Sequence, residues 1–409
     1  MQLLFTQSDT GSWCVENEAK ESFLIIPVLP PHKAMRSVPT TVQIYQYDAT
    51  PAAGRQPLLL VHGLKNEYVP SFHWQKVCEY LTSDETFQKR YKIYLARYNT
   101  MAPEKQVEAA FKPALRNLAA ADGHPLVIVA LSLSGSVIRN AMADQSTNTS
   151  VSRMITLGTP FHGSPIFSKD WLMYSSLLHR TWPTRVSRYI GYKVYFKHHP
   201  NLLLDYYWDN CDGQIPSLGP YRFRLPFLVH GTLLPPETAP SGASCLQSGE
   251  KIIAYAGYFR NSAAQTSRHT KLFAVLHAPL YFVDTTIPAF FGNPRAVLRF
   301  LNCEMAMMVK KDKNNQMAYT FNDGISPIMS TLSLTHSSAR DVQSWNENDF
   351  ETLKFKLDVK RARLFPNIDH LAYLEGGSPP GRTNKLSDQL SPEERPRPLF
   401  AWLLKDILN

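Results

Sequence analysis

The chain has 409 residues and a formal net charge of +9, and 44% of its residues are hydrophobic against 19% charged. This composition excludes an intrinsically disordered chain and predicts a globular protein with a large core. No run of about 18 apolar residues occurs, which predicts no transmembrane segment. Residues 1–9 lack a basic start and an apolar stretch, so we expect no signal peptide. The expected location is therefore cytoplasmic, or secreted if a leader has been removed.

The basic residues are dispersed, and the only short cluster is Lys310–Lys313. Dispersed positive charge favours solubility and transient contact with an anionic lipid interface over nucleic-acid binding. The five cysteines include no C-x-x-C pair, and their odd number argues against a fully paired disulfide framework. A Cys211–Cys245 disulfide is one alternative, but buried or free thiols are favoured. Nothing in the sequence indicates an oligomeric state.

Two β-rich runs, at residues 22–29 and 40–47, precede the main pattern and are expected to form antiparallel strands. The second run alternates with period two, which predicts a half-exposed strand. Strands and helices then alternate, with strands expected at 58–61, 91–98, 126–131 and 151–157 and helices at 73–81, 104–120 and 136–144. Pro113 should kink or interrupt the 104–120 helix. Repeated strand–helix units predict a parallel sheet with helices on both faces.

The most informative segment is 126–139, L-V-I-V-A-L-S-L-S-G-S-V-I-R, where an apolar strand runs into a serine and then a helix. A nucleophilic serine on such a sharp turn needs small neighbours because the backbone approaches closely on both sides. The usual pattern is G-x-S-x-G, and here Ala130 and Ser134 replace the two glycines around Ser132. Ser134 is the rival nucleophile, but Ser132 directly follows the strand. The pattern alone fits a buried strand and a serine-rich helix start equally well.

The regular alternation ends after Gly163. Residues 164–249 are rich in aromatic residues and prolines, which predicts a cap or lid inserted over an active site, with an ordinary helical subdomain as the alternative. We divide the chain into an N-terminal part of the core (1–163), the insertion (164–249) and a C-terminal part of the core (250–409). Later expectations are a strand at 250–259, an apolar helical stretch at 269–300 that could belong to the cap, a loop at 376–398 and an amphipathic helix at 399–407.

Four further segments occur in a fixed order around the serine: His-Gly after the strand 57–61, Gly-Thr-Pro after the strand 154–157, Asn-Asp-Gly at 322–324 and Asp-His-Leu at 369–371. Together they resemble the α/β-hydrolase superfamily, particularly bacterial triacylglycerol lipases and esterases. Those proteins carry segments such as H-G-[LM], T-[LI]-G-T-P, N-D-G and [DN]-H-L. The resemblance runs from about residue 58 to 371. It implies an α/β-hydrolase fold, with a mostly parallel central sheet, flanking helices and an inserted cap.

The same resemblance implies a catalytic triad in the chain order Ser, Asp, His, which Ser132, Asp323 and His370 satisfy. Asn-Asp-Gly is also an ordinary turn signature, so Asp284 is an alternative acid. Asp369 is expected to point away from the ring of its neighbour. His336 is the second candidate base. His62 and His162 lie in family motifs, where the resemblance implies structural roles. His198 and His199 lack metal-ligand spacing.

The backbone N–H groups of Leu64 and Leu133 are expected to form the oxyanion hole, because Leu64 follows His-Gly and Leu133 follows the nucleophile at the start of a helix. Some bacterial lipases hold a structural Ca²⁺ through an aspartate that corresponds to Ala372. That ligand is missing, so we expect no Ca²⁺. No zinc-spaced cluster of histidines and cysteines is present in the sequence, and no cofactor is expected.

These observations predict a serine carboxylic-ester hydrolase, a lipase or esterase that acts on esters of apolar acyl chains. Phospholipase, acyltransferase or polyester-hydrolase activity on the same triad is an alternative, because the sequence does not show acceptor access. A catalytically silent binding protein of the same fold is an alternative of a different class. A nucleotide-binding protein is disfavoured, because no glycine-rich phosphate loop follows any strand.

Overall fold

The computed structural model describes residues 2–5, 41–47, 54–63, 74–100, 102, 104–161, 164, 250–258, 322–333, 360–376, 391, 394 and 397–409. The expected strand at 22–29, the helical stretch at 269–300 and all of the expected insertion except Ser164 lie outside the described residues. The domain boundaries therefore stay predictions. Within the described part, no helix is long and apolar enough to cross a membrane.

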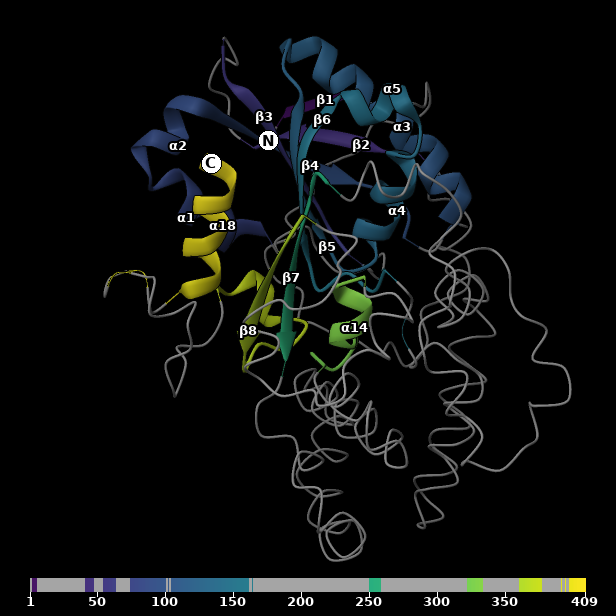
Figure 1. The fold of residues 1–409 in the computed structure, drawn as a ribbon. Helices are drawn as coiled ribbons and strands as arrows, with labels where there is room; N and C mark the ends of the chain where they lie inside the picture. The colour runs from purple at the N-terminus through teal and green to yellow at the C-terminus, as the bar shows by residue number, and fades with distance from the viewer. Residues whose placement is uncertain are drawn as a thin grey trace, which may run out of the picture.

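One eight-stranded sheet organises the described residues, with the strand order β1-β2-β4-β3-β5-β6-β7-β8. Strand β2 pairs antiparallel with β1 and β4, and the remaining neighbours pair in parallel (Figure 1). This order confirms the expected α/β-hydrolase fold. The strands are β1 (Gln2–Phe5), β2 (Gln43–Gln46), β3 (Gln56–Val61), β4 (Tyr91–Arg97), β5 (Leu126–Leu131), β6 (Val151–Leu157), β7 (Ile252–Tyr258) and β8 (Arg361–Pro366).

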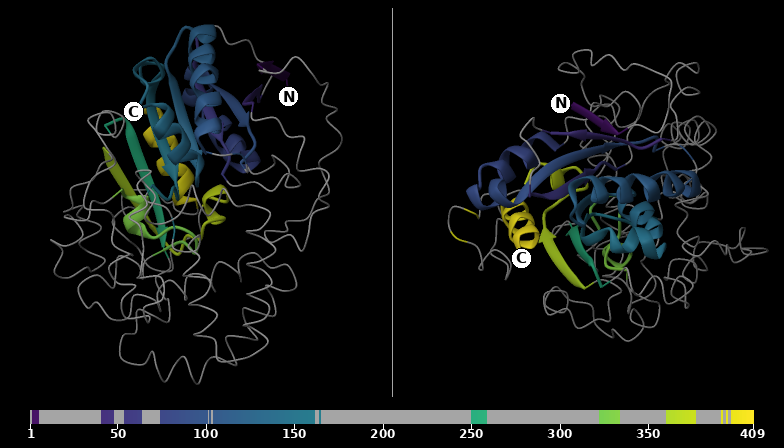
Figure 2. Two further views of the ribbon diagram at one scale, coloured as in Figure 1. Left: turned by 90° about the vertical axis from the view of Figure 1, so that its right-hand side faces the viewer. Right: turned by 90° about the horizontal axis from the view of Figure 1, so that it is seen from above.

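Helices cover both faces of the sheet, as Figure 2 shows. One face carries α3 (Glu104–Asp122) and α4 (Ser134–Ala141), and the other carries α1 (Gln75–Thr82), α2 (Glu85–Arg90) and α18 (Pro398–Leu408). The shorter described helices are α5 (Gln145–Thr149), α14 (Ile328–Thr331) and the 3₁₀ turn η7 (Ala372–Leu374). This three-layer arrangement buries the apolar stripe of each helix against the strands.

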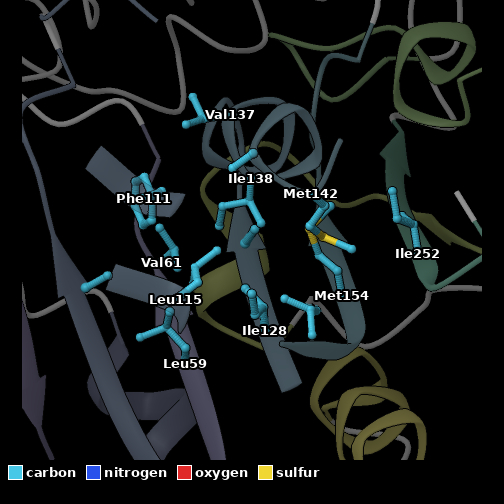
Figure 3. Packing of buried hydrophobic residues seen from close by; sticks show 14 of the residues in the cluster. Leu59, Val61, Phe111, Leu115, Ile128, Val137, Ile138, Met142, Met154 and Ile252 are labelled. Atoms are coloured by element: carbon cyan, nitrogen blue, oxygen red, sulfur yellow. The ribbon is translucent and has the colours of Figure 1, made fainter. Parts of the chain in front are cut away.

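The central strands are buried on both faces, which explains their nearly continuous apolar sequences. In β5, the side chains of Leu126, Ile128 and Ala130 join the cluster beneath α3 and α4. The alternate residues Val127 and Val129 join the cluster beneath α1 and α18. Figure 3 shows the first cluster, in which side chains of α3 and α4 interlock with those of the strands: Phe111, Leu115, Val137 and Ile138 with Leu59, Val61 and Ile128.

The expected exposure of β2 was wrong, and the helix at 104–120 is not interrupted at Pro113. Strand β2 is not half-exposed: all four of its residues are buried, because Ile44 faces one hydrophobic cluster and Tyr45 the other. The helix α3 also runs through Pro113 without interruption. The missing N–H of Pro113 deprives the carbonyl of Ala109 of its partner, but Ala109 is exposed, so water can replace that hydrogen bond.

A buried cluster of charged and polar side chains fastens α18 to the sheet. Asp406 is fully buried and accepts two hydrogen bonds from the Arg363 guanidinium, at 3.0 and 2.8 Å. The hydroxyl of Tyr255 donates to the same carboxylate at 2.6 Å. Burial and the charge of Asp406 raise the pKa of Tyr255 well above its usual value, so the phenol stays protonated. The Arg363 guanidinium also lies 4.0 Å from the centroid of the Trp402 ring.

We expect Asp406→Ala to lower the free energy of unfolding by about 3 kcal/mol, because it leaves the largely buried Arg363 charge without a partner. The matched control is Lys405→Ala on the same helix, which removes a partly exposed ion pair with Glu394 at 3.0 Å. That change should cost less than about 1 kcal/mol. Urea denaturation followed by circular dichroism measures both, and equal losses would contradict the assigned role of the buried cluster.

Candidate active site

The sheet topology brings two strand ends together at its centre. β3 lies between β4 and β5, and the helices that follow β3 and β4 cover opposite faces of the sheet. In open α/β sheets, such a reversal leaves a crevice outside the carboxyl ends of the strands, where ligands bind. The segment His62–Gly63 follows β3 and Ser132 follows β5, so both predicted motifs lie at this position.

Ser132 occupies a strained turn between β5 and α4. Its φ of 57° lies in the left-handed region, which a non-glycine residue rarely adopts. Two hydrogen bonds fix its peptide groups: the Ser132 N–H donates to the Leu157 carbonyl at 2.8 Å, and the Thr159 hydroxyl donates to the Ser132 carbonyl at 2.7 Å. Such strain persists only where the surroundings determine the backbone, and it is concentrated at functional sites.

Two glycines make room for this turn. A Cβ atom on Gly63 would lie 2.6 Å from the Cβ of Ser132, closer than real Cβ contacts allow. A Cβ atom on Gly135 would lie 2.7 Å from the Cγ2 of Thr159. The strand end after β3, the serine turn and the segment after β6 are therefore packed together with no space for another carbon.

The structure brings the three predicted triad residues into one chain of contacts. The Oγ of Ser132 lies 2.8 Å from the Nε2 of His370, and the Nδ1 of His370 lies 2.7 Å from the Oδ2 of Asp323. The His370 side chain is 12% exposed and the Asp323 side chain is fully buried. A serine, a base and an orienting acid within hydrogen-bond distance are the arrangement that nucleophilic catalysis requires.

Asp323 lies in a turn between β7 and β8. Its Oδ1 accepts hydrogen bonds from the N–H groups of Ile325 and Ser326, at 2.9 and 2.6 Å, and the side chain of Asn322 accepts one from Gly324 at 2.9 Å. These contacts form an Asx-type turn. The Asn-Asp-Gly segment is thus both a turn and a candidate catalytic element, because one carboxylate oxygen holds the loop while the other faces His370.

His370 lies after β8, and its backbone N–H donates to the Asp323 carbonyl at 2.9 Å. The two residues therefore meet through both backbone and side chain. Asp369 turns the other way: its Oδ1 accepts the N–H groups of Leu371 and Ala372, at 3.0 and 2.9 Å, at the start of η7. Asp369 thus shapes the turn after the histidine, whereas Asp323 contacts the imidazole.

The rival serine is engaged elsewhere. Ser134 is fully buried, and its hydroxyl lies within hydrogen-bond distance of the carbonyls of Leu131 and Val61, at 2.7 and 3.1 Å. Ser134 thus ties the first turn of α4 to β3, and its hydroxyl is directed at backbone rather than at His370. The G-x-S-x-G pattern has a glycine at this position, so the serine found here adds a hydrogen bond between the serine turn and β3.

His62 is likewise packed into the scaffold. Its Nδ1 lies 2.8 Å from the Gly63 carbonyl, and its ring stacks on that of Tyr98 with centroids 4.7 Å apart. Leu133 directly follows the serine at the N-terminal end of α4, where a helix leaves N–H groups without intrahelical partners. The other expected site residues and rivals lie outside the described part of the chain: Leu64, His162, His198, His199, Asp284 and His336.

The sequence analysis missed three residues that contact the triad. Thr159 anchors the Ser132 carbonyl, as described above, and it belongs to the Gly-Thr-Pro motif, so its place in that motif could have signalled it. Gly158 adopts a φ of 60° beside Asp323. Tyr373 is fully buried next to both Asp323 and His370. No local pattern around Tyr373 signals this contact.

No protein-family profile matches the chain, and no curated protein matches its sequence. Among solved structures, a mature lipase from Bacillus licheniformis is similar at 15% identity and a TM-score of 0.39, covering 81% of this chain and 93% of that one. A metagenomic carboxyl esterase is similar at 13% identity and a TM-score of 0.39, covering 87% and 76%. A phospholipase from Legionella pneumophila covers 27% of each chain at 20% identity and a TM-score of 0.24. The fold is defined by the strand order of the sheet.

We expect Gly63→Ala to reduce kcat/KM for an ester substrate by about 100-fold, because the new Cβ must displace Ser132 from its position beside His370. Gly54→Ala is the control: this glycine has a φ of 76° and open space around it, so its substitution strains the backbone without touching the serine turn. Thermal unfolding of both variants separates folding from activity. A fully active Gly63→Ala protein would show that the close approach is unimportant.

Proposed function

We propose that this protein is a serine carboxylic-ester hydrolase that cleaves esters of apolar acyl chains through an acyl-enzyme intermediate. One observation carries the proposal: Ser132, in a left-handed turn after the central strand, contacts His370 at 2.8 Å, and His370 contacts the buried Asp323 at 2.7 Å. The strand order of the sheet supports the same conclusion, because a serine at this turn is the nucleophile position of α/β-hydrolases.

In the proposed reaction, the Ser132 hydroxyl attacks the ester carbonyl while the Nε2 of His370 takes the hydroxyl proton. Asp323 holds the imidazole by its Nδ1 and stabilises the imidazolium that forms. His370 then gives the proton to the leaving alcohol, and the C–O bond of the ester breaks to leave an acylated Ser132. A water molecule, deprotonated by His370, hydrolyses the acyl-enzyme and restores the serine.

The negative charge that develops on the carbonyl oxygen needs fixed hydrogen-bond donors. The Leu133 N–H follows the nucleophile at the positive end of α4 and supports this role. The N–H of Leu64 is proposed as the second donor from its position after His-Gly in the sequence. The proposed donors follow β3 and β5, and they would lie close together because Gly63 packs directly against Ser132.

The apolar acyl group is proposed from the aromatic composition of residues 164–249. Lids of lipases cover apolar pockets, so aromatic side chains in such an insertion would contact the acyl chain. Phospholipase, acyltransferase and polyester-hydrolase activities use the same nucleophile, and they differ only in the leaving group or in the acceptor that releases the acyl group. The same triad therefore accommodates them as alternatives.

We expect Ser132→Ala to reduce the hydrolysis of p-nitrophenyl butyrate and palmitate at least about 10³-fold, because no other hydroxyl faces His370 among the described residues. Ser134→Ala should retain activity within about tenfold, since its hydroxyl binds backbone carbonyls. The ratio of the butyrate and palmitate rates separates esterase from lipase. Turnover by Ser132→Ala would make Ser134 the candidate nucleophile.

A wild-type protein inactive on both esters would favour the silent binding protein. Labelling with a fluorophosphonate probe decides between an inactive serine and an unsuitable substrate, because the probe reacts with an activated serine of any serine hydrolase.

Asp323→Asn is expected to lower kcat about 10⁴-fold, because an amide can present its N–H to His370 and hold the wrong imidazole tautomer. The matched control is Asp369→Asn, a neighbouring carboxylate whose Oδ1 accepts the backbone N–H groups of Leu371 and Ala372. Its kcat should fall less than about tenfold. Steady-state kinetics on p-nitrophenyl butyrate measure both, and equal losses would exclude Asp323 as the orienting acid.

A further inference from the structure

Tyr373 is a buried phenol against the triad that the proposed mechanism does not use. It lies in η7, three residues after His370, and no part of its side chain is exposed. The ring meets the His370 imidazole edge-on, with centroids 6.0 Å apart and an interplanar angle of 89°. Tyr373 therefore packs against the base from the side of β7, where no solvent reaches it.

The hydroxyl of Tyr373 accepts a hydrogen bond from the N–H of Gly257 in β7 at 2.5 Å. That contact leaves the phenolic proton available for donation, and the buried Asp323 carboxylate beside the phenol can accept it. Burial and then the charge of Asp323 raise the pKa of Tyr373 well above its usual value, which keeps that proton in place.

A glycine makes this contact sterically feasible. A Cβ atom on Gly158 would lie 2.6 Å from the Cε2 of Tyr373 and 2.9 Å from the Oδ2 of Asp323. The phenol and the carboxylate thus converge on the space that a side chain at position 158 would fill. The φ of 60° at Gly158 is a second reason for glycine at this position.

The hydrogen bonds of Asp323 show what Tyr373 adds. Its Oδ1 is held by two backbone N–H groups of its own loop, and its Oδ2 contacts the Nδ1 of His370. The tyrosine supplies a donor from outside that loop, fixed to the sheet through Gly257. Tyr373 thereby links Asp323, whose loop follows β7, to the backbone of β7.

We propose that Tyr373 is a positioning residue of the triad, which anchors the Asp323 carboxylate to β7 and moderates its hold on His370. This inference rests on the proposed function. The donated proton draws negative charge away from the carboxylate, so the imidazolium is stabilised less than it would be by an unbound Asp323. The ionisable groups that interact with Tyr373 are Asp323, Asp369 and, edge-on, His370.

The test is Tyr373→Phe, with Tyr255→Phe as the matched control. Both tyrosines are fully buried, and each lies beside a buried carboxylate. The carboxylate beside Tyr373 is Asp323, whereas Tyr255 donates to Asp406, which fastens α18. We expect Tyr373→Phe to lower kcat for p-nitrophenyl butyrate about tenfold with KM within about twofold, because the Asp323 carboxylate is no longer anchored to β7. The acidic limb of the kcat/KM profile should move to higher pH by up to about one unit, because Asp323 then stabilises the imidazolium more. Tyr255→Phe should lower Tm with the kinetics unchanged.

A double-mutant cycle with Asp323→Asn keeps the inference testable if Tyr373→Phe is also unstable. If the tyrosine acts through the acid, then Tyr373→Phe should lower kcat no further in the Asp323→Asn protein. Additive losses and an unmoved acidic limb, with wild-type activity intact, would overturn the inference alone. A wild type that neither turned over the esters nor reacted with a fluorophosphonate would overturn the proposed function, and this inference with it.

Discussion

The left-handed backbone of Ser132 is the constraint on which the rest of the site depends. A φ of 57° turns the chain sharply at the end of β5, and the serine hydroxyl faces His370. Two segments hold this conformation: the end of β6, through the Leu157 carbonyl and the Thr159 hydroxyl, and the segment after β3, through the close packing of Gly63. The strain at one residue is thus offset by hydrogen bonds and packing from two neighbouring strands.

The second half of the site depends on β7 and β8. The side chain of Tyr255 in β7 donates to Asp406 of α18, and the backbone N–H of Gly257, two residues further on, donates to the Tyr373 hydroxyl beside Asp323. One strand therefore carries both the attachment of the last described helix and the contact beside Asp323. β7 and β8 thus help to place Asp323 and His370, which do not depend on their loops alone.

The sequence predicted the parts of this arrangement that are encoded locally. The alternating strands and helices were enough to predict the sheet, and the resemblance carried by the ordered motifs singled out Ser132, Asp323 and His370. The burial of β2 could not be read from its alternating pattern, because it depends on which elements cover each face. Tyr373 was missed for a similar reason: its partner Gly257 is 116 positions away in the chain.

The long chain segment between β7 and β8 bears on the order in which the parts of the candidate site form. The strands are neighbours in the sheet, but residues 259–360 lie between them in the chain. The serine turn is built almost entirely from residues 56–161, whose contacts are far more local. Since distant pairings close larger loops at greater entropic cost, the serine turn should form before the acid and base dock. A folding intermediate would then carry the shaped serine turn without its contacts to His370 and Asp323, and the proposed catalytic residues would meet only at the last stage of folding.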